Sequence, residues 1–192
     1  KKVFNERDKK KIVSKYNLPK EFILNVGTIE TRKNILLAVK TLHNINTCLV
    51  IVGKETDYTI EVKSYIKKHN LEHKVIFLKG LTLEELAILY QQAKIFVYPS
   101  LYEGFGIPII EALYSKTPVI TTQGGVFPEA GGPNSVYIDP TNVLDLEKAI
   151  QKLLVDKEFR ENMIQKGFEF VQKFNDEVIA NKIIAIYKSL DN

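Results

Sequence analysis

Cysteine is nearly absent from this 192-residue chain, whose one cysteine, Cys48, lies in the apolar run CLVIV. A single cysteine excludes an intramolecular disulfide and a cysteine metal cage, and a buried inert thiol is typical of a reducing compartment. The chain also has no apolar stretch near the roughly 18 residues that span a bilayer. Its first residues, KKVFNERDKKKI, lack the apolar middle of a signal peptide. We therefore expect a cytoplasmic protein.

A strong excess of one charge is also missing. The chain has 27 Lys and Arg against 23 Asp and Glu, and its lysine runs lie in separate polar stretches. A nucleic-acid-binding face would be more concentrated, so we expect no nucleic-acid partner. His43, His69 and His73 lack the spacing of paired metal ligands, and surface histidines are the favoured interpretation. An initiator methionine is absent too, and we expect a fragment of a longer chain.

Short apolar runs alternate with longer amphipathic segments. The short runs are rich in β-branched and aromatic residues, as strands are, and the longer ones carry apolar residues at helical spacing. This alternation predicts a parallel sheet with helices on both faces, because each parallel crossover needs a helix. We expect one domain over 1–192 of the α/β class, a Rossmann-like, doubly wound, six-stranded parallel sheet with extra C-terminal helices. The expected strands are 22–27, 47–53, 74–80, 94–100, 117–122 and 135–139, and the expected helices are 34–44, 59–70, 83–93, 107–116, 143–156, 157–174 and 176–190.

The loop SLYEGFGIPIIE follows the fourth expected strand, at the sheet edge where ligands bind in open α/β folds. Pro108 suits the first helical turn, which leaves Gly104 and Gly106 just before the helix. Glycines there let a ligand approach the backbone, and the free N–H groups of a helix start attract an anion. The loop therefore favours a phosphate site, although a plain strand-to-helix turn explains the glycines equally well.

Two glutamates, Glu103 and Glu111, flank this glycine turn. We expect Glu111 in the first helical turn, with its carboxylate directed back toward the loop. Ionised carboxylates accept hydrogen bonds from pairs of hydroxyls, which sugars supply. The acids therefore suit the sugar rings on either side of a diphosphate. Taken separately, Glu111 is also explained as a helix-dipole partner and Glu103 as an exposed acid.

A basic pair, Arg32 and Lys33, follows the first expected strand, which ends at Gly27. Cations at a helix start oppose the helix dipole, so a functional role would explain the cost. A guanidinium and an ammonium fixed beside a nucleoside diphosphate would stabilise the charge that develops as the diphosphate leaves. A solvated pair is the alternative.

The segment SLYEGFGIPIIEAL resembles the E-x7-E motif of the family 4, group 1 retaining glycosyltransferases, and GTIETRKN, GLTLEEL and GGVFPE fall in the order of that family's other donor-site loops. The resemblance covers roughly residues 20–190. It implies the C-terminal, nucleotide-sugar-binding half of a GT-B enzyme, with Arg32 and Lys33 on the diphosphate, Glu103 facing the transferred sugar and Glu111 on the ribose. Thr28 departs from the arginine that many members carry there, so the diphosphate is expected to rely more on Arg32. The further positions implied to bind the donor are Gly27, Thr28, Gly80, Leu81, Thr82, Gly104, Phe105, Gly106 and Ile107.

Other features leave alternatives open. Thr82 and Glu85 form a capping-box pattern at a helix start, and the resemblance adds a contact of this backbone with the nucleobase. The glycine-rich loop TTQGGVFPEAGGPN either covers the donor or is a flexible connector. Tyr102 and Phe105 either line the site or serve in packing.

Together these features predict a metal-independent, retaining glycosyltransferase that uses an NDP-sugar such as GDP-mannose or a UDP-hexose, without a cofactor. The expected acceptor is a glycan or a lipid-linked glycan. The helix over 176–190 is expected to pack on a missing N-terminal acceptor domain, through which any peripheral membrane contact would occur. We expect the fragment to bind donor without transferring it. The alternatives are another GT-B enzyme, such as an epimerase or a phosphorylase, and a non-catalytic α/β interaction domain.

Overall fold

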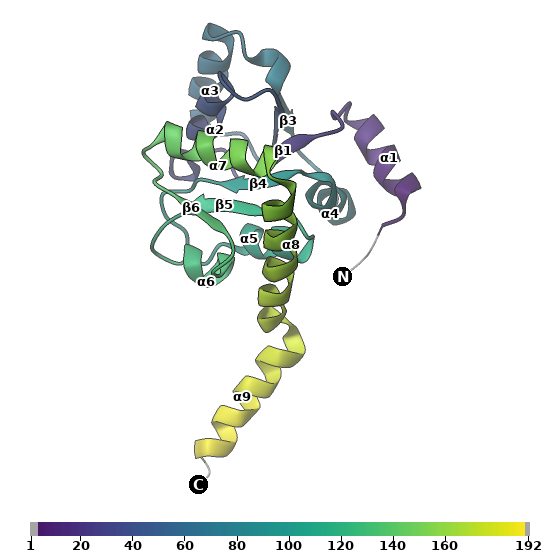
Figure 1. The fold of residues 1–192 in the computed structure, drawn as a ribbon, viewed down its shortest axis with the longest axis vertical. Helices are drawn as coiled ribbons and strands as arrows, with labels where there is room; N and C mark the ends of the chain where they lie inside the picture. Colours follow the sequence, from purple (N-terminus) through teal and green to yellow (C-terminus); the bar gives the residue numbers. More distant parts are fainter. Residues whose placement is uncertain (1–3, 191–192) are drawn as a thin grey trace.

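The computed structural model describes residues 4–190 and contains one six-stranded sheet whose strands are all parallel, in the order β3-β2-β1-β4-β5-β6 (Figure 1). The order in which strands are added reverses at β1. Strands β2 and β3 lie on one side of β1, and β4, β5 and β6 follow on the other, where Ile23 of β1 pairs with Ile95 of β4. The predicted Rossmann-like α/β class is confirmed. The strands are β1 (Phe22–Val26), β2 (Cys48–Val52), β3 (Val75–Leu78), β4 (Ile95–Tyr98), β5 (Val119–Thr122) and β6 (Val136–Ile138).

Helices cover both faces of the sheet, as its apolar strands require. The α-helices are α1 (Glu6–Lys15), α2 (Ile35–Thr41), α3 (Tyr58–Lys68), α4 (Leu83–Gln92), α5 (Ile107–Tyr114), α6 (Phe127–Gly131), α7 (Val143–Val155), α8 (Lys157–Val171) and α9 (Asp176–Leu190). The 3₁₀ turns are η1 (Thr31–Lys33), η2 (Glu72–Lys74) and η3 (Gln172–Phe174).

The core divides into two clusters, one on each face of the sheet. Ile23 of β1 packs with α2, α3 and α7, while its neighbours Phe22 and Leu24 pack with α1, α4 and α5. Successive side chains of a strand point to opposite faces, which accounts for this division. All three side chains are at most 1% exposed. Helices thus pack against both faces of the sheet, and the loops begin at the ends of buried strands.

Two helices were not expected from the sequence. Helix α1 begins after Asn5, whose side chain accepts a hydrogen bond from the Asp8 amide, and it packs against α4. Helix α6 lies within the glycine-rich loop, because Phe127 and Ala130 are buried there and hold one turn of helix in place. That part of the loop is therefore packed structure and not a flexible connector.

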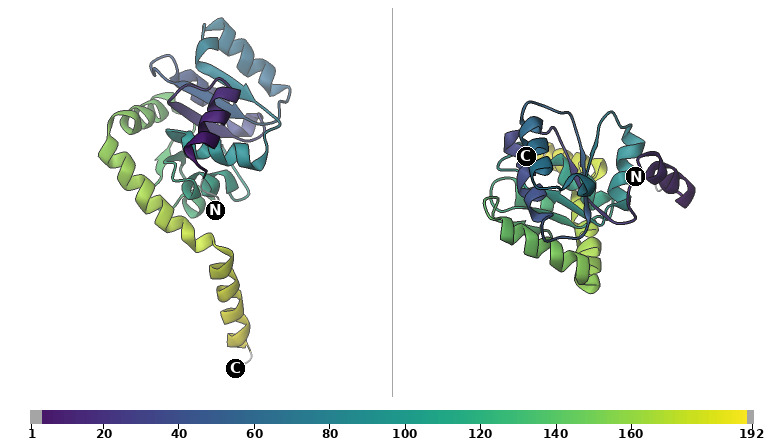
Figure 2. Two further views of the ribbon diagram at one scale, coloured as in Figure 1. Left: turned by 90° about the vertical axis from the view of Figure 1, so that its right-hand side faces the viewer. Right: turned by 90° about the horizontal axis from the view of Figure 1, so that it is seen from above.

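Helix α9 extends away from the body of the domain (Figures 1 and 2). Its apolar residues are largely exposed, among them Ile179, Ile183 and Ile186 at 42%, 48% and 60%. The expectation that a further domain covers this helix stays a prediction. Within residues 4–190, no helix has the length and apolar character needed to cross a membrane.

Gly53 permits the closest backbone approach at the edge that carries the loops. A Cβ at Gly53 would lie 1.8 Å from the carbonyl oxygen of Gly27, which directly follows β1. Because the obstacle is backbone, the two strand ends would have to separate.

We expect Gly53→Ala to lower the free energy of unfolding by about 2 kcal/mol or more, as overpacked sites do. Gly104→Ala is the control, because a Cβ there meets nothing within 4 Å. Urea unfolding of both variants measures the effect, and equal stability of Gly53→Ala and the parent would contradict the clash.

Candidate functional site

The basic pair lies in η1, between β1 and α2, and not at the start of the helix itself. Arg32 and Lys33 form the 3₁₀ turn, and Asn34 then adopts a left-handed conformation with φ 53° before α2 begins at Ile35. The Arg32 carbonyl accepts a hydrogen bond of 2.8 Å from the Leu101 amide in the loop after β4. The pair is therefore fixed to the opposite loop by its own backbone.

Asn34 joins three loops at this edge of the sheet. Its side-chain amide donates to the carbonyl oxygens of Pro99, after β4, at 3.2 Å, and of Pro140, after β6, at 2.8 Å. Asparagine tolerates the left-handed conformation better than most residues, which suits it to this position. The sequence analysis missed this residue, although its place directly after the basic pair was a usable signal.

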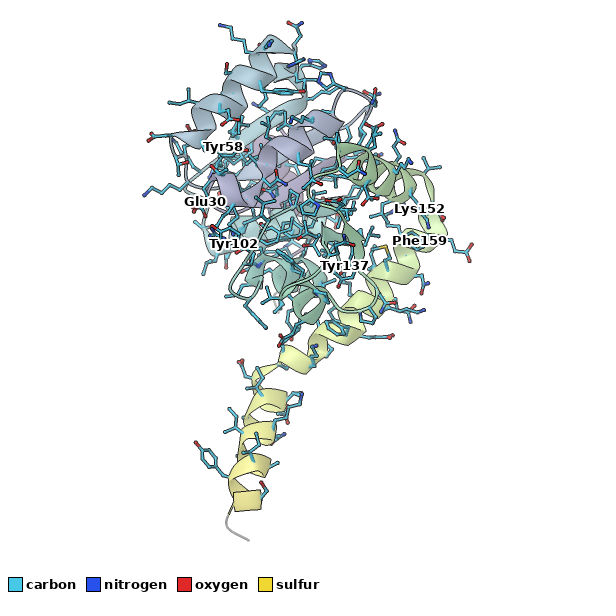
Figure 3. The ribbon with its side chains drawn as sticks, turned by 90° about the vertical axis from the view of Figure 1, so that its left-hand side faces the viewer. Glu30, Tyr58, Tyr102, Tyr137, Lys152 and Phe159 are labelled. Atoms are coloured by element: carbon cyan, nitrogen blue, oxygen red, sulfur yellow. The ribbon has the colours of Figure 1, made fainter. Side chains whose placement is uncertain are left out.

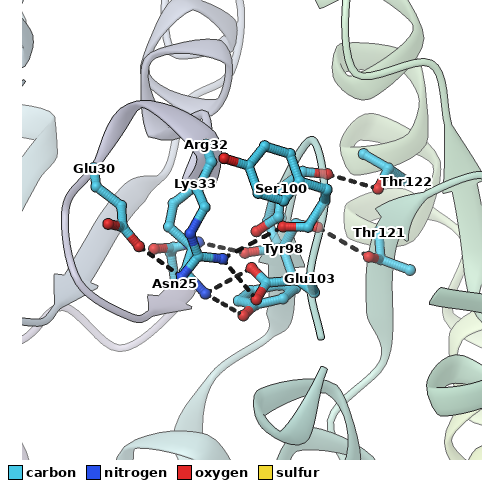
Figure 4. Close-up of polar contacts among 11 residues, drawn as sticks. Asn25, Glu30, Arg32, Lys33, Tyr98, Ser100, Glu103, Thr121 and Thr122 are labelled. Atoms are coloured by element: carbon cyan, nitrogen blue, oxygen red, sulfur yellow. Dashed lines mark hydrogen bonds and ion pairs between the residues drawn. The ribbon is translucent and has the colours of Figure 1, made fainter. Parts of the chain in front are cut away.

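Glu103 lies between the two cations (Figure 4). Lys33 Nζ is 2.6 Å from its Oε1 and Arg32 Nη1 is 2.9 Å from its Oε2. The Glu103 and Lys33 side chains are 8% and 10% exposed, whereas that of Arg32 is 31% exposed. The structure thus brings together Arg32, Lys33 and Glu103, the three residues predicted to be catalytic. Their roles stay a prediction.

Arg32 has further partners at the rim. Its Nη2 lies 2.7 Å from Glu30 Oε1, and its guanidinium carbon lies 5.8 Å from the centre of the Tyr102 ring. Glu30 and Tyr102 lie near each other on this side of the domain (Figure 3). Two acids therefore balance the two cations.

Tyr98, the last residue of β4, contacts the ammonium group of Lys33. Lys33 Nζ donates to the Tyr98 hydroxyl at 2.7 Å and lies 4.9 Å from the centre of its ring. Burial raises the pKa of Tyr98, and the negative charge of Glu103 raises it further. The sequence analysis missed Tyr98, because a tyrosine in an apolar strand is usually a packing residue.

Hydrogen bonds control the ionisation of Glu103. Burial alone would raise its pKa, but hydrogen bonds from Lys33 and Arg32 outweigh burial and lower the pKa below its ordinary value of 4.5. Ser100 Oγ is itself buried and has no hydrogen-bond partner of ordinary geometry among the described residues. Because its pKa lies below 4.5, Glu103 is ionised at neutral pH, and both of its oxygens act as acceptors only.

The glycine turn leads directly into α5. Gly106 is the N-cap with φ 96°, and Ile107 is the first helical residue. A Cβ at Gly106 would lie 3.2 Å from Ile109 Cδ1, so both space and backbone conformation favour glycine. Glu111 consequently lies in the second helical turn, and the expectation of a first-turn position was wrong. Phe105 packs edge-on against Phe174, with ring centres 5.7 Å apart.

Glu111 has a different partner from Glu103. Its Oε2 accepts a hydrogen bond of 2.9 Å from the hydroxyl of Tyr90 on α4. Both residues line a groove of about 830 Å³, whose walls come mainly from α4, α5 and the segment that leads into α9. Among the contacts of residues 4–190, Glu111 pairs with Tyr90 and not with Arg32 or Lys33. The two glutamates are therefore held in separate networks.

The start of α4 has the predicted capping box. Thr82 Oγ1 accepts from the Glu85 amide at 3.2 Å, and Glu85 Oε2 accepts from the Thr82 amide at 2.9 Å. Hydrogen bonds from Lys15 and the Thr82 amide lower the pKa of Glu85 to about 2. Gly80 precedes the box with φ 70° and open space around it. Contact of Gly80, Leu81 and Thr82 with a base stays a prediction.

The remaining predicted donor contacts lie along the same edge. Gly27, with φ 149°, follows β1 beside the Lys33 stem, and Thr28 follows it in the loop. Gly104 is exposed between Glu103 and the start of α5. Their contacts with a ligand stay a prediction.

An all-parallel sheet of this order, with its charged loops where β1 and β4 diverge, defines a Rossmann-like domain of the kind found in GT-B glycosyltransferases. The family described as "Glycosyl transferases group 1" matches residues 6–170. The chain belongs to this family.

Similarity to individual proteins agrees with the family. The chain is 34% identical over 153 residues, 79% of its length, to an O-antigen chain mannosyltransferase of Salmonella typhimurium, covering 43% of that protein. It is 31% identical over 186 residues, 93% of its length, to O-antigen chain mannosyltransferase B of Escherichia coli, covering 49% of it. The chain thus spans about half the length of these relatives.

Solved structures share the fold. A sucrose-phosphate synthase from Thermosynechococcus elongatus superposes with a TM-score of 0.83 at 30% identity, over 94% of this chain and 48% of that one. The C-terminal domain of a group 1 glycosyl transferase from Francisella tularensis superposes with a TM-score of 0.75 at 24% identity, over 90% of this chain and 93% of that domain.

We expect Glu103→Gln to lower the free energy of unfolding by about 1–3 kcal/mol, because two cations lose a charged hydrogen-bond acceptor. Urea unfolding at pH 7 measures the change. Glu21→Gln is the control: its ion pair with Lys94 is as short, at 2.6 Å, but the Glu21 side chain is 56% exposed. Exposed pairs contribute little. Equal losses of unfolding free energy in both variants would contradict the prediction, because the buried ion cluster would then stabilise the domain no more than an exposed ion pair.

The stability difference between the parent and Glu103→Gln is expected to depend on pH. The pKa of Glu103 is lowered on folding, so the unfolded state binds more protons and the stabilisation is complete above the ordinary value of 4.5. It is lost as pH falls through the folded pKa. We therefore expect the stability difference between the parent and Glu103→Gln to be constant from pH 6 to 7 and to shrink below about pH 4.5. Unfolding curves across this range would contradict the assignment if the difference stayed constant throughout.

Proposed function

We propose that this chain is the donor-binding domain of a glycosyltransferase that takes a hexosyl group from a nucleotide sugar. The observation that carries the proposal is the convergence of Arg32 and Lys33 on Glu103, across the point where β1 and β4 diverge. Ligands of doubly wound folds bind at this point of the sheet. Membership of the family supports the reaction class.

The cations suit a diphosphate that becomes more negative as the sugar leaves. Lys33 has three N–H donors, of which Tyr98 and Glu103 take two, so one stays available. The Arg32 guanidinium is partly exposed and planar, and it suits bidentate contact with phosphate oxygens. In this proposal the phosphates share the cations with Glu103, and the fixed charges stabilise the leaving group in place of a metal ion.

The two glutamates are proposed to bind the rings on either side of the diphosphate. Glu103 would face the transferred sugar, and Glu111 would accept hydrogen bonds from the ribose hydroxyls. The backbone of Gly80, Leu81 and Thr82 would lie against the base, and that of residues 104–107 against the diphosphate or sugar. Gly27 and Thr28 complete the wall beside Lys33.

We propose a mannosyl donor, GDP-mannose, because the two relatives described above are named as O-antigen mannosyltransferases. A UDP-hexose is the alternative donor, and a glycan is the proposed acceptor. Retention of anomeric configuration is proposed from the family resemblance. Because the chain spans about half of these relatives, acceptor binding and transfer are proposed to require a further domain, with α9 packed against it.

Two other functions are distinguishable by experiment. An epimerase or phosphorylase built on the same fold would give a different product from the same donor, and product analysis with the longer protein separates them. A non-catalytic domain would bind none of a panel of GDP-, UDP- and ADP-sugars.

The test is titration calorimetry of the 192-residue chain with GDP-mannose and UDP-glucose. We expect Lys33→Met to weaken binding of the preferred donor about 10- to 100-fold, because one charged contact to phosphate is lost. Methionine keeps the stem that packs beside Gly27.

Lys94→Met is the matched control for this experiment. Lys94 precedes β4 at the opposite edge of the sheet, where it pairs with Glu21. Its replacement is expected to leave the affinity unchanged. Equal affinity of the Lys33 variant and the parent would refute the proposed site.

A further inference from the structure

Tyr90 is the buried residue in direct contact with Glu111. Its side chain, on α4, is 2% exposed, and its hydroxyl donates to Glu111 Oε2 at 2.9 Å. The sequence analysis assigned Tyr90 no role beyond the apolar face of a helix. Tyr90 nevertheless lines the same groove as Glu111.

The core fixes the position of this hydroxyl. The Tyr90 ring packs against Phe96 of β4 with ring centres 5.3 Å apart, and the Tyr90 carbonyl accepts a 2.6 Å hydrogen bond from the Thr117 hydroxyl. Neither neighbour is mobile at the surface, because Phe96 and Thr117 are at most 1% exposed. The ring therefore has one position, set by the central strands.

A glutamate side chain on a helix has three rotatable bonds, and ordering it costs conformational entropy. The bond from Tyr90 holds Oε2 in advance, and among the described contacts Oε1 and the second lone pair of Oε2 keep acceptor capacity. A carboxylate held in this way can accept a hydrogen bond from a ligand in the groove with little further loss of side-chain conformational entropy.

The rest of the groove suits a nucleoside. Leu83 and Leu86 provide apolar wall from α4, and Leu83 is 85% exposed. The N-cap of the same helix is Thr82, in the backbone segment proposed to meet the base. A nucleoside lying along α4 from its start would bring its ribose toward Glu111.

We propose that Tyr90 is a positioning residue, which orients Glu111 so that its carboxylate selects a ribose with both hydroxyls over a deoxyribose. This inference rests on the proposed function, which places the ribose at Glu111, and adds the residue that orients that carboxylate. Burial, and then the charge of Glu111, raise the pKa of Tyr90, so the phenol donates throughout the pH range of a binding experiment.

The experiment compares GDP with 2′-deoxy-GDP, and UDP with 2′-deoxy-UDP, by titration calorimetry of the 192-residue chain. We expect the parent to prefer the ribose form of its base about tenfold or more, as one hydrogen bond to a carboxylate allows. Tyr90→Phe is expected to reduce this preference at least threefold, with the affinity for the deoxy form changed less than twofold. A merely structural role would weaken both forms alike.

Tyr114→Phe is the matched control. Tyr114 lines the same groove, but its hydroxyl donates to Asn175 Oδ1 at 2.6 Å. This variant is expected to keep the full preference for ribose. Glu111→Gln is expected to lose most of the preference, and adding Tyr90→Phe to it should cause no further loss.

The outcomes are decisive in each case. An unchanged preference in Tyr90→Phe, or equal weakening of both nucleotide forms, overturns the inference and leaves the proposed function intact. If Tyr90→Phe unfolds, Glu111→Asp replaces it: the shorter carboxylate would no longer reach the fixed Tyr90 hydroxyl, and an unchanged preference for ribose in that variant overturns the inference. Failure of the parent to bind any of the four nucleotides overturns both proposals.

Discussion

The ion cluster of Lys33, Arg32 and Glu103 is the interaction on which the arrangement of the loops depends. It joins a turn after β1 to a loop after β4, over about 70 residues of sequence, with N–O distances of 2.6 and 2.9 Å. Removing a cation or an acid from such a half-buried cluster leaves an uncompensated charge, which costs more than the pair contributes. The cluster therefore fixes the mutual position of the two loops more than it adds to total stability.

The surrounding structure makes this cluster possible by bringing backbone close to backbone. Gly53 lets the ends of β1 and β2 approach, and Asn34 bonds the loops after β4 and β6 to the start of α2. The Leu101 amide adds a bond to the Arg32 carbonyl. These contacts involve uncharged groups, so they persist at any pH and salt concentration at which the domain is folded. The charged residues thus meet on a framework that does not depend on their charges.

The alternation of strands and helices predicted the fold because apolar periodicity is set locally. The pairing of Arg32 and Lys33 with the Glu103 loop was also predictable in outline, since the carboxyl ends of parallel strands share one edge. The contacts of Tyr98, Asn34 and Tyr90 were not, because they join residues distant in sequence through atoms that no periodicity reveals. Helix α1 was missed because its sequence is mostly charged, and α6 because glycines flank it.

The structure also explains how two acids lie beside a glycine turn that suits anions. Glu103 is bonded to two cations, so its charge is compensated and its oxygens are engaged. Glu111 accepts a hydrogen bond from a phenol and not from a cation among the described contacts, and part of its acceptor capacity stays unused there. In the proposed function a phosphate would compete with Glu103 for the same donors, whereas a sugar hydroxyl at Glu111 would use acceptor capacity that the bond from Tyr90 leaves over among the described contacts. The two acids therefore differ in what a ligand must displace, and this difference follows from their partners and not from their own chemistry.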